Sequence, residues 1–203
     1  MKTMKNDWII TSYYTRDTYY EGVARDHIMK SVKELELPHI IKEVANLGDW
    51  QKNTHYKATF VSEMLRTGKD VVFVDCDAKI HSYPILFDTI DTDVAYHHYC
   101  PSGRPNRNEL LSGTMFFKNN EKVAELVAEW QKALLNSTIW EQKILAQIVD
   151  DYKKRGKISV TNLPPQYCTI FDFMGHVKDP IVEHFQKSRL YRRNKSLKKE
   201  LYP

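Results

Sequence analysis

The most constraining feature of this sequence is an unbroken apolar run that ends in two carboxylates. Residues 71–74 read Val-Val-Phe-Val, and Asp75 and Asp77 follow at once. Valine and phenylalanine favour β-strands, and a run without polar alternation is typical of a strand that is covered on both faces. The sequence therefore predicts a central strand in a helix-covered sheet, with two acidic side chains at the carboxyl end of that strand.

Strand and helix patterns alternate along the rest of the chain. We expect further strands at 8–13, 39–45, 94–98, 110–118, 158–160 and 181–185, and helices at 18–35, 54–66, 84–90, 121–135 and 140–154. This alternation predicts an α/β fold with a mostly parallel, Rossmann-like central sheet flanked by helices. A length of 203 residues fits a single domain. In such sheets ligands bind beyond the carboxyl ends of the strands, where Asp75 and Asp77 lie.

The composition is that of an ordinary globular protein, with 42% hydrophobic and 28% charged residues. No apolar run approaches the roughly 20 residues that a membrane span needs. The three cysteines are odd in number and form no Cys-x-x-Cys pair, which argues against a disulfide framework. We therefore expect a cytoplasmic protein without a signal peptide or a transmembrane segment.

The C-terminal segment is strongly basic. Between Lys187 and Lys199 the chain carries seven lysines and arginines and no acid. We expect a domain over residues 1–186 and a basic tail over 187–203. Such a tail is either a solvated terminus or a contact for a polyanion, such as a diphosphate, an anionic membrane surface or nucleic acid.

The spacing of Asp75 and Asp77 points to a metal. Side chains two residues apart on an extended chain face the same side. Two unpaired carboxylates in that position repel each other and resist loss of water, and a divalent cation removes both problems. Hard carboxylate oxygens suit Mg²⁺ or Mn²⁺. The alternative is a pair of surface aspartates in a turn.

These residues resemble those of nucleotide-diphospho-sugar transferases of the GT-A fold, particularly the small retaining galactosyltransferase-like groups. The segment Val-Phe-Val-Asp-Cys-Asp-Ala at 72–78 is similar to the strand and DxD motif of that family, and the resemblance runs in order from Trp8 to about Arg193. It implies a metal-dependent hexosyl- or pentosyltransferase that uses a nucleotide-diphosphate sugar, expected to be a UDP-sugar, with retention. Both aspartates would bind Mn²⁺ below the donor diphosphate, with Mg²⁺ as the second option.

The resemblance also implies a donor-binding set: Thr11, Ser12, Tyr13, Lys57, Asp75, Ser112 and Gly113. The first three fall where the family places its nucleotide loop, at the end of the first strand. Lys57 lies where similar enzymes carry a basic residue that reaches the donor. Ser112 and Gly113 match a small-residue patch beside the donor sugar, where glycine lets a ligand approach the backbone. Packing, a solvated lysine and a strand bulge are the respective alternatives.

Two later segments complete the site that the resemblance implies. Glu141 and Gln142 match a catalytic pair in which the carboxylate contacts sugar hydroxyls and the amide lies near the reacting carbon. A glutamate at a helix start is also favoured by the helix dipole alone. His184 matches the third protein ligand of Mn²⁺, with packing as the alternative, and Lys187 and Arg189 match the cations that grip the diphosphate.

The acceptor stays open among a glycan, a lipid-linked sugar, a protein and a modified DNA base. We expect the turn-forming segment from Cys100 to Asn108 and the C-terminal segment to form its site. Two other functions compete. A sugar-phosphate nucleotidylyltransferase is disfavoured because residues 11–15 contain no glycine for a phosphate loop. A non-catalytic glycan- or nucleic-acid-binding module is disfavoured by the intact Asp75, Asp77 and His184.

Overall fold

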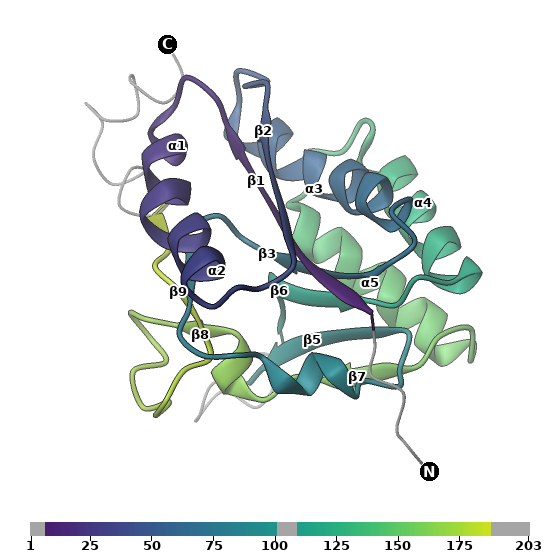
Figure 1. The fold of residues 1–203 in the computed structure, drawn as a ribbon. Coiled ribbons are helices and arrows are strands. Elements are labelled where there is room, and N and C mark those ends of the chain that lie inside the picture. Colours follow the sequence, from purple (N-terminus) through teal and green to yellow (C-terminus); the bar gives the residue numbers. More distant parts are fainter. Residues whose placement is uncertain (1–6, 101–108, 188–203) are drawn as a thin grey trace.

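The computed structural model describes residues 7–100 and 109–187. Its centre is a six-stranded sheet in the order β2-β1-β3-β6-β5-β7 (Figure 1). The strands are β1 (Trp8–Thr15), β2 (His39–Val44), β3 (Asp70–Val74), β5 (Val94–Tyr99), β6 (Glu109–Phe117) and β7 (Val160–Asn162). Every strand of this sheet runs in one direction except β6, which is antiparallel to both β3 and β5. The predicted mostly parallel sheet is confirmed.

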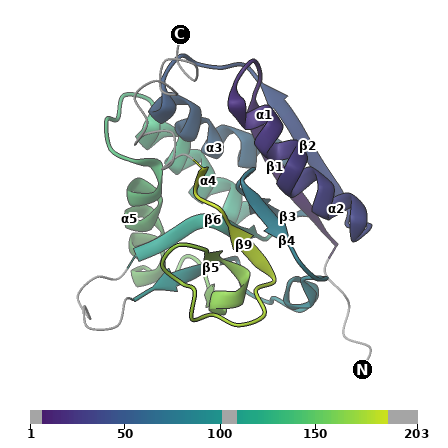
Figure 2. The same ribbon diagram turned by 90° about the vertical axis from the view of Figure 1, so that its left-hand side faces the viewer.

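Helices cover both faces of this sheet (Figure 2). One face carries α1 (Tyr19–Ala24) and α2 (Lys30–Glu34), joined by one π-helical segment (Arg25–Met29), and the other carries α3 (Trp50–Leu65), α4 (Glu121–Leu134) and α5 (Glu141–Lys154). Successive side chains of β3 point alternately to the two helical layers. Val71 and Phe73 pack with α3, α4 and α5, whereas Val72 and Val74 pack with α1 and α2. The apolar run is thus buried on both faces, as predicted, within one domain.

A second, three-stranded sheet lies beside the first and has the order β4-β9-β8. It consists of β4 (Ala78–Ile80), β8 (Thr169–Ile170) and β9 (Val182–His184), with short 3₁₀ helices at Ile85–Asp88 and Pro165–Tyr167. The pattern at 181–185 predicted β9, but β4 and β8 were missed because strands this short have no pattern of their own. Antiparallel pairing places Ala78 opposite His184, which returns the C-terminal part of the described chain to Asp77.

Several element boundaries differ from the sequence prediction, and the predicted helices at 18–35 and 84–90 are a helix with a π-helical segment inside it and a short 3₁₀ helix. Strand β1 continues to Thr15 because β2 pairs with it up to that residue. Helix α3 begins at Trp50 because the Asp49 carboxylate caps it, accepting the N–H groups of residues 51 and 52 at 2.8 and 3.2 Å. Strand β7 begins at Val160, and the N–H of the preceding Ser159 donates to the Asp93 side chain at 2.8 Å. No helix in the described part of the chain is both long and apolar enough to cross a membrane.

The partner of Ser159 is Asp93, which joins three elements. One Asp93 oxygen accepts the Ser159 N–H and O–H groups, each at 2.8 Å, and the other accepts the Asn120 amide at 2.8 Å. Asn120 is also the residue that caps α4. Burial alone would raise the pKa of Asp93, but the hydrogen bonds from Ser159 and Asn120 outweigh it and lower that pKa below its ordinary value.

Asp93→Asn is therefore expected to lower the free energy of unfolding by about 1.5–3 kcal/mol at pH 7, the usual value of hydrogen bonds to a charged group. A carboxylate whose folded pKa is depressed contributes its stability above its unfolded pKa of about 4, and loses it as the pH falls through the folded pKa. The difference between the two proteins should therefore shrink on acidification. Urea unfolding at pH 7 and pH 3 measures it, and a difference that stays constant would contradict the assignment.

Candidate active site

A cleft of about 1190 Å³, its open mouth included, lies at the carboxyl ends of β1 and β3. Most of the site residues predicted from the sequence line it, namely Tyr13, Lys57, Asp75, Asp77, Ser112, Gly113, Glu141, Gln142 and His184. The fold therefore brings together residues that are up to 171 positions apart, as counted from 13 to 184.

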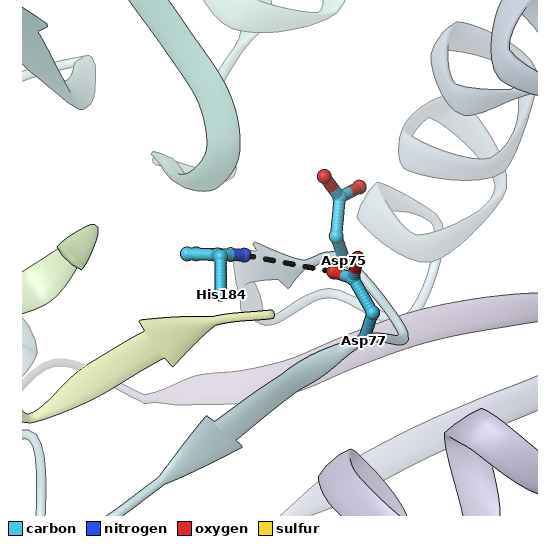
Figure 3. Close-up of side chains that lie close together, drawn as sticks. All are labelled: Asp75, Asp77 and His184. Carbon is cyan, nitrogen blue, oxygen red and sulfur yellow. Dashed lines mark ion pairs between the residues drawn. The ribbon is translucent and has the colours of Figure 1, made fainter. Parts of the chain in front are cut away.

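Asp75, Asp77 and His184 form a cluster that can hold a metal ion (Figure 3). One ligand atom from each lies within 4.8 Å of the others, and the gap between Asp77 Oδ1 and His184 Nδ1 is 4.0 Å. The aspartates occupy the turn between β3 and β4, and His184 ends β9. The turn is fixed by the Asp75 N–H, which donates to Gly113 O at 2.8 Å. Pairing of β4 with β9 then brings the imidazole to the carboxylates.

The His184 ring is arranged as a metal ligand. Its Nε2 lies 2.8 Å from Thr114 Oγ1, whereas its Nδ1 is buried and has no hydrogen-bond partner among residues 7–100 and 109–187. Burial lowers the pKa of His184 to about 4, so the ring is neutral near pH 7. With Nε2–H donated to Thr114, Nδ1 presents its lone pair toward Asp77. Such an outer hydrogen bond is the usual way in which proteins orient a ligating histidine.

Asp77 carries the electrostatic strain of the cluster. Its side chain is buried, and burial together with repulsion from Asp75 raises the pKa of Asp77 to about 6. The Lys187 backbone N–H donates to Asp77 Oδ2 at 2.9 Å, and this hydrogen bond offsets only part of the rise in the pKa of Asp77. A divalent cation between the two carboxylates and the Nδ1 lone pair would remove the strain. The residues present therefore fit a metal, and one nitrogen beside carboxylate oxygens suits Mn²⁺ better than Mg²⁺.

Gly113 makes room for the His184 ring. A Cβ atom at this position would lie 2.8 Å from His184 Cε1 and 3.1 Å from Nδ1, closer than side chains pack. The family resemblance implies that this glycine lets the ligand approach the backbone. The structure instead fills that space with the imidazole, although Gly113 also borders the cleft.

Gly113→Ala is therefore expected to displace His184 and weaken Mn²⁺ binding by about 10- to 100-fold, as the loss of outer support for a metal ligand does. Calorimetric titration with Mn²⁺ measures this directly. Gly175→Ala is the matched control, because its added Cβ would meet nothing nearer than Phe171 O at 4.0 Å. Equal Mn²⁺ affinity in the two variants would contradict the role given to Gly113.

Lys57 connects the cluster of Asp75, Asp77 and His184 to Glu141. Its ammonium, in a residue that is only 4% exposed, lies 3.0 Å from Asp75 Oδ1 and 3.3 Å from Glu141 Oε1. Burial alone would lower the pKa of Lys57, but attraction to Asp75 and Glu141 outweighs it and raises that pKa above its ordinary value. Lys57 is thus a permanent internal cation. The sequence analysis placed it near the donor and did not predict its two carboxylate partners.

Ser112 holds Glu141 and Gln142 in place. Its hydroxyl lies 3.1 Å from Glu141 Oε1 and 3.2 Å from Gln142 Oε1, and its N–H donates to the same Gln142 oxygen at 3.1 Å. Lys57 donates to both the Ser112 hydroxyl and its carbonyl at 3.3 Å. Glu141 Oε2 is buried and has no hydrogen-bond partner within the described chain. A ligand hydroxyl in the cleft could therefore donate to it.

A family model described as nucleotide-diphospho-sugar transferase matches residues 27–191. The chain belongs to this family. It is therefore a glycosyltransferase, an enzyme that moves a sugar from a nucleotide-activated donor. The matched region contains every cleft residue discussed above except Tyr13. No relative was found among curated proteins.

Solved structures of other glycosyltransferases share the fold. One, described as involved in the glycosylation of the major capsid of PBCV-1, has a TM-score of 0.69 and 15% identity, over 95% of this chain and 99% of that one. Another, the apo form of GlyE from Streptococcus pneumoniae TIGR4, has a TM-score of 0.58 and 13% identity, over 89% of this chain and 54% of that one. At such identities the likeness shows the fold alone, and it agrees with the GT-A-like sheet.

Two residues that were predicted to contact the nucleotide, Thr11 and Ser12, do not line the cleft. Thr11 and Ser12 are fully buried inside β1, where Thr11 Oγ1 lies 3.4 Å from Val72 O. Because β1 continues to Thr15, the residues that reach the cleft are Tyr13 and the two that follow it. Burial is the main cause that raises the pKa of Tyr13 well above its ordinary value, so its hydroxyl stays protonated and donates to Asn53 O at 2.8 Å.

The predicted diphosphate contacts are only partly visible. Lys187 does not line the cleft; its backbone N–H supports Asp77, and its ammonium lies 5.7 Å from the centre of the Phe185 ring. Arg189, together with the rest of the basic tail over 188–203, lies outside the described residues, as do residues 101–108 of the expected acceptor loop.

Sequence reasoning missed three side chains that bear on the site. Thr114, which orients His184, follows Gly113 directly and could have been found from that position. Trp50 and Trp140 also line the cleft, at the starts of α3 and α5. Their signal was a large aromatic residue at the polar start of a helix, where no core is available to bury it.

Proposed function

We propose that this glycosyltransferase is metal-dependent, takes a UDP-sugar as its donor, and transfers the sugar to an acceptor hydroxyl with retention. The observation that carries the proposal is the buried Nδ1 of His184, which has no hydrogen-bond partner in the described chain and faces two carboxylates. Asp75, Asp77 and His184 would hold Mn²⁺, or Mg²⁺ less well. When bound, the cation would supply positive charge beside the diphosphate and stabilise the leaving group.

The chain's own residues then divide the remaining work. Glu141 Oε2, which has no hydrogen-bond partner in the described chain, accepts a hydrogen bond from a hydroxyl of the donor sugar and so holds the anomeric carbon in place. Lys57 holds the Glu141 carboxylate in position, with its ammonium 3.3 Å from Glu141 Oε1. Ser112 fixes the Gln142 amide through two hydrogen bonds to its oxygen. The protein thus orients the donor with groups that are already in position before it binds.

Retention is supported by the likeness of Glu141 and Gln142 to the pair of the retaining enzymes. In that mechanism the acceptor oxygen bonds to the anomeric carbon while the bond from that carbon to the phosphate oxygen breaks. The acceptor proton passes to the departing phosphate oxygen, so no separate base is needed. No disulfide joins Cys76, Cys100 and Cys168 within the described residues, which supports our proposal of a reducing, cytoplasmic compartment.

A nucleotide-sugar screen tests this function. The full chain is incubated with UDP-glucose, UDP-galactose, UDP-N-acetylglucosamine or UDP-xylose, with Mn²⁺ or with a chelator, and release of UDP is measured. Slow, Mn²⁺-dependent hydrolysis of at least one donor is expected. Hydrolysis that is indifferent to the chelator would contradict the metal. Binding of donors without any turnover would favour the non-catalytic module, and release of pyrophosphate from UTP and a sugar phosphate would favour a nucleotidylyltransferase.

A further inference from the structure

Two tryptophans stand together at the cleft. Trp50 is the first residue of α3, and Trp140 directly precedes α5. Both line the cleft, and their ring centres lie 6.4 Å apart with the planes inclined by 45°. Trp140 is 40% exposed, and Trp50 is half-buried. The pair therefore presents aromatic surface to a ligand that enters this cleft.

The tryptophan pair borders the reacting part of the site. Trp140 is the immediate neighbour of Glu141, whose free oxygen is assigned to the donor sugar. Trp50 stands on α3 about two helical turns before Lys57, which contacts the same carboxylate. A molecule that covers the two rings thus lies beside the donor sugar, where the attacking hydroxyl must come from.

The chemistry around the rings selects the class of molecule. Exposed indole surface gains about 25 cal/mol for each Å² that a ligand covers. Asn53 and Thr54, one turn after Trp50 on α3, line the cleft as well, so polar side chains interrupt the apolar surface. A lipid chain or an apolar helix needs continuous apolar surface. A sugar ring instead has one face of C–H groups and a rim of hydroxyls, which matches aromatic faces set among hydrogen-bonding groups.

We infer that Trp50 and Trp140 form the acceptor subsite and that the acceptor is a glycan, with a pyranose ring packed against Trp140. This inference rests on the proposed function, because it takes the donor sugar to lie at Glu141. It differs from the acceptor site expected from the sequence, which placed the acceptor at residues 100–108 and the C-terminal segment.

The four tryptophans of the chain provide the test. The indole N–H groups of Trp8 and Trp130 are internal, donating to Asp88 Oδ1 at 2.7 Å and to Glu141 O at 3.2 Å. Proton–nitrogen correlation spectra of the ¹⁵N-labelled full chain resolve the indole signals, which Trp→Phe variants assign. A panel of methyl glycosides of common hexoses and pentoses, with the corresponding disaccharides, is titrated in the presence of UDP and Mn²⁺.

At least one saccharide is expected to move the Trp140 and Trp50 signals in a saturable way while the Trp8 signal stays in place. Trp140→Ala should weaken that binding by about tenfold or more, as loss of a central aromatic contact does. Trp140→Phe, which keeps a ring, should weaken it less. Leu135→Ala, an exposed apolar residue that does not line the cleft, is the matched control and should bind as the unchanged chain does.

Three results would overturn the inference: no saccharide moves the Trp140 signal, Trp140→Ala binds the saccharide within about twofold of the unchanged chain, or UDP alone saturates the shifts of both rings. The last result would assign the pair to the nucleotide base. The proposed function fails separately, if UDP with Mn²⁺ produces no binding that depends on Asp77. The two failures are read from different titrations of the same sample.

Discussion

Asp77→Asn is expected to abolish sugar transfer, lowering kcat by about 1,000-fold or more, because a metal that stabilises the leaving group is lost. The same change should leave the metal-free protein at least as stable as before. A buried carboxylate whose pKa is raised to about 6 by burial and by Asp75 is unfavourable when ionised, and asparagine removes that charge. An asparagine oxygen can still accept the Lys187 N–H.

Activity and stability thus move independently in this variant, which separates a metal ligand from a structural residue. UDP release and the melting temperature in chelator measure the two effects at pH 7.5. Asp91→Asn is the matched control, since the Asp91 side chain is fully exposed and forms only a surface ion pair with Lys118. Turnover near that of the unchanged enzyme, or a large fall in the melting temperature of metal-free Asp77→Asn, would contradict the assignment.

Lys57→Met is expected to lower the free energy of unfolding by about 3–5 kcal/mol, the usual result of removing one partner from a buried ion pair. The lost ammonium leaves the carboxylates of Asp75 and Glu141 without their cation, 3.0 and 3.3 Å from where it lay. Methionine fills most of the volume, so the effect reports charge more than packing. Sugar transfer should also fall, since Glu141 loses the ammonium contact that holds its carboxylate in position.

Urea unfolding in chelator gives the stability change, and donor hydrolysis gives the activity. Lys57→Arg keeps a cation at the site and should recover most of the stability. Lys154→Met provides the control, because Lys154 forms an exposed pair with Asp150 on the surface of α5, where such pairs contribute little. If Lys57→Met and Lys154→Met are equally stable, the Lys57 network has no energetic role.

Local patterns in the sequence predicted the parts of the fold that carry long, regular periodicity. The apolar run at 71–74 and the helices on both faces were predictable, because the spacing of apolar residues within each segment reflects which of its side chains are buried. Strands β4 and β8 do not. They have three and two residues, and only their pairing with β9 makes them strands. Their positions depend on tertiary structure, which no local pattern contains.

The site divides in the same way. Asp75 and Asp77 lie two positions apart directly after an apolar strand pattern, and this combination predicted a metal site from the sequence. The contacts of Lys57 with Ser112 and Glu141 join α3, β6 and α5, and they follow from packing rather than from any motif. Thr11 was assigned to the nucleotide because β1 was predicted to end two residues too early. Pairing with β2, not local preference, sets that strand end.

In the proposed function, His184 coordinates a divalent cation together with Asp75 and Asp77. Pulsed electron paramagnetic resonance of the full chain with one equivalent of Mn²⁺ and UDP measures this directly, because a coordinated imidazole couples its nitrogen to the metal's electron spin. We expect the coupling of a single directly bound ¹⁴N in the unchanged chain. In His184→Ala this coupling should disappear, while Mn²⁺ still binds the two aspartates with lower affinity. A bound Mn²⁺ without nitrogen coupling, or the same coupling in His184→Ala, would contradict coordination of the cation by His184.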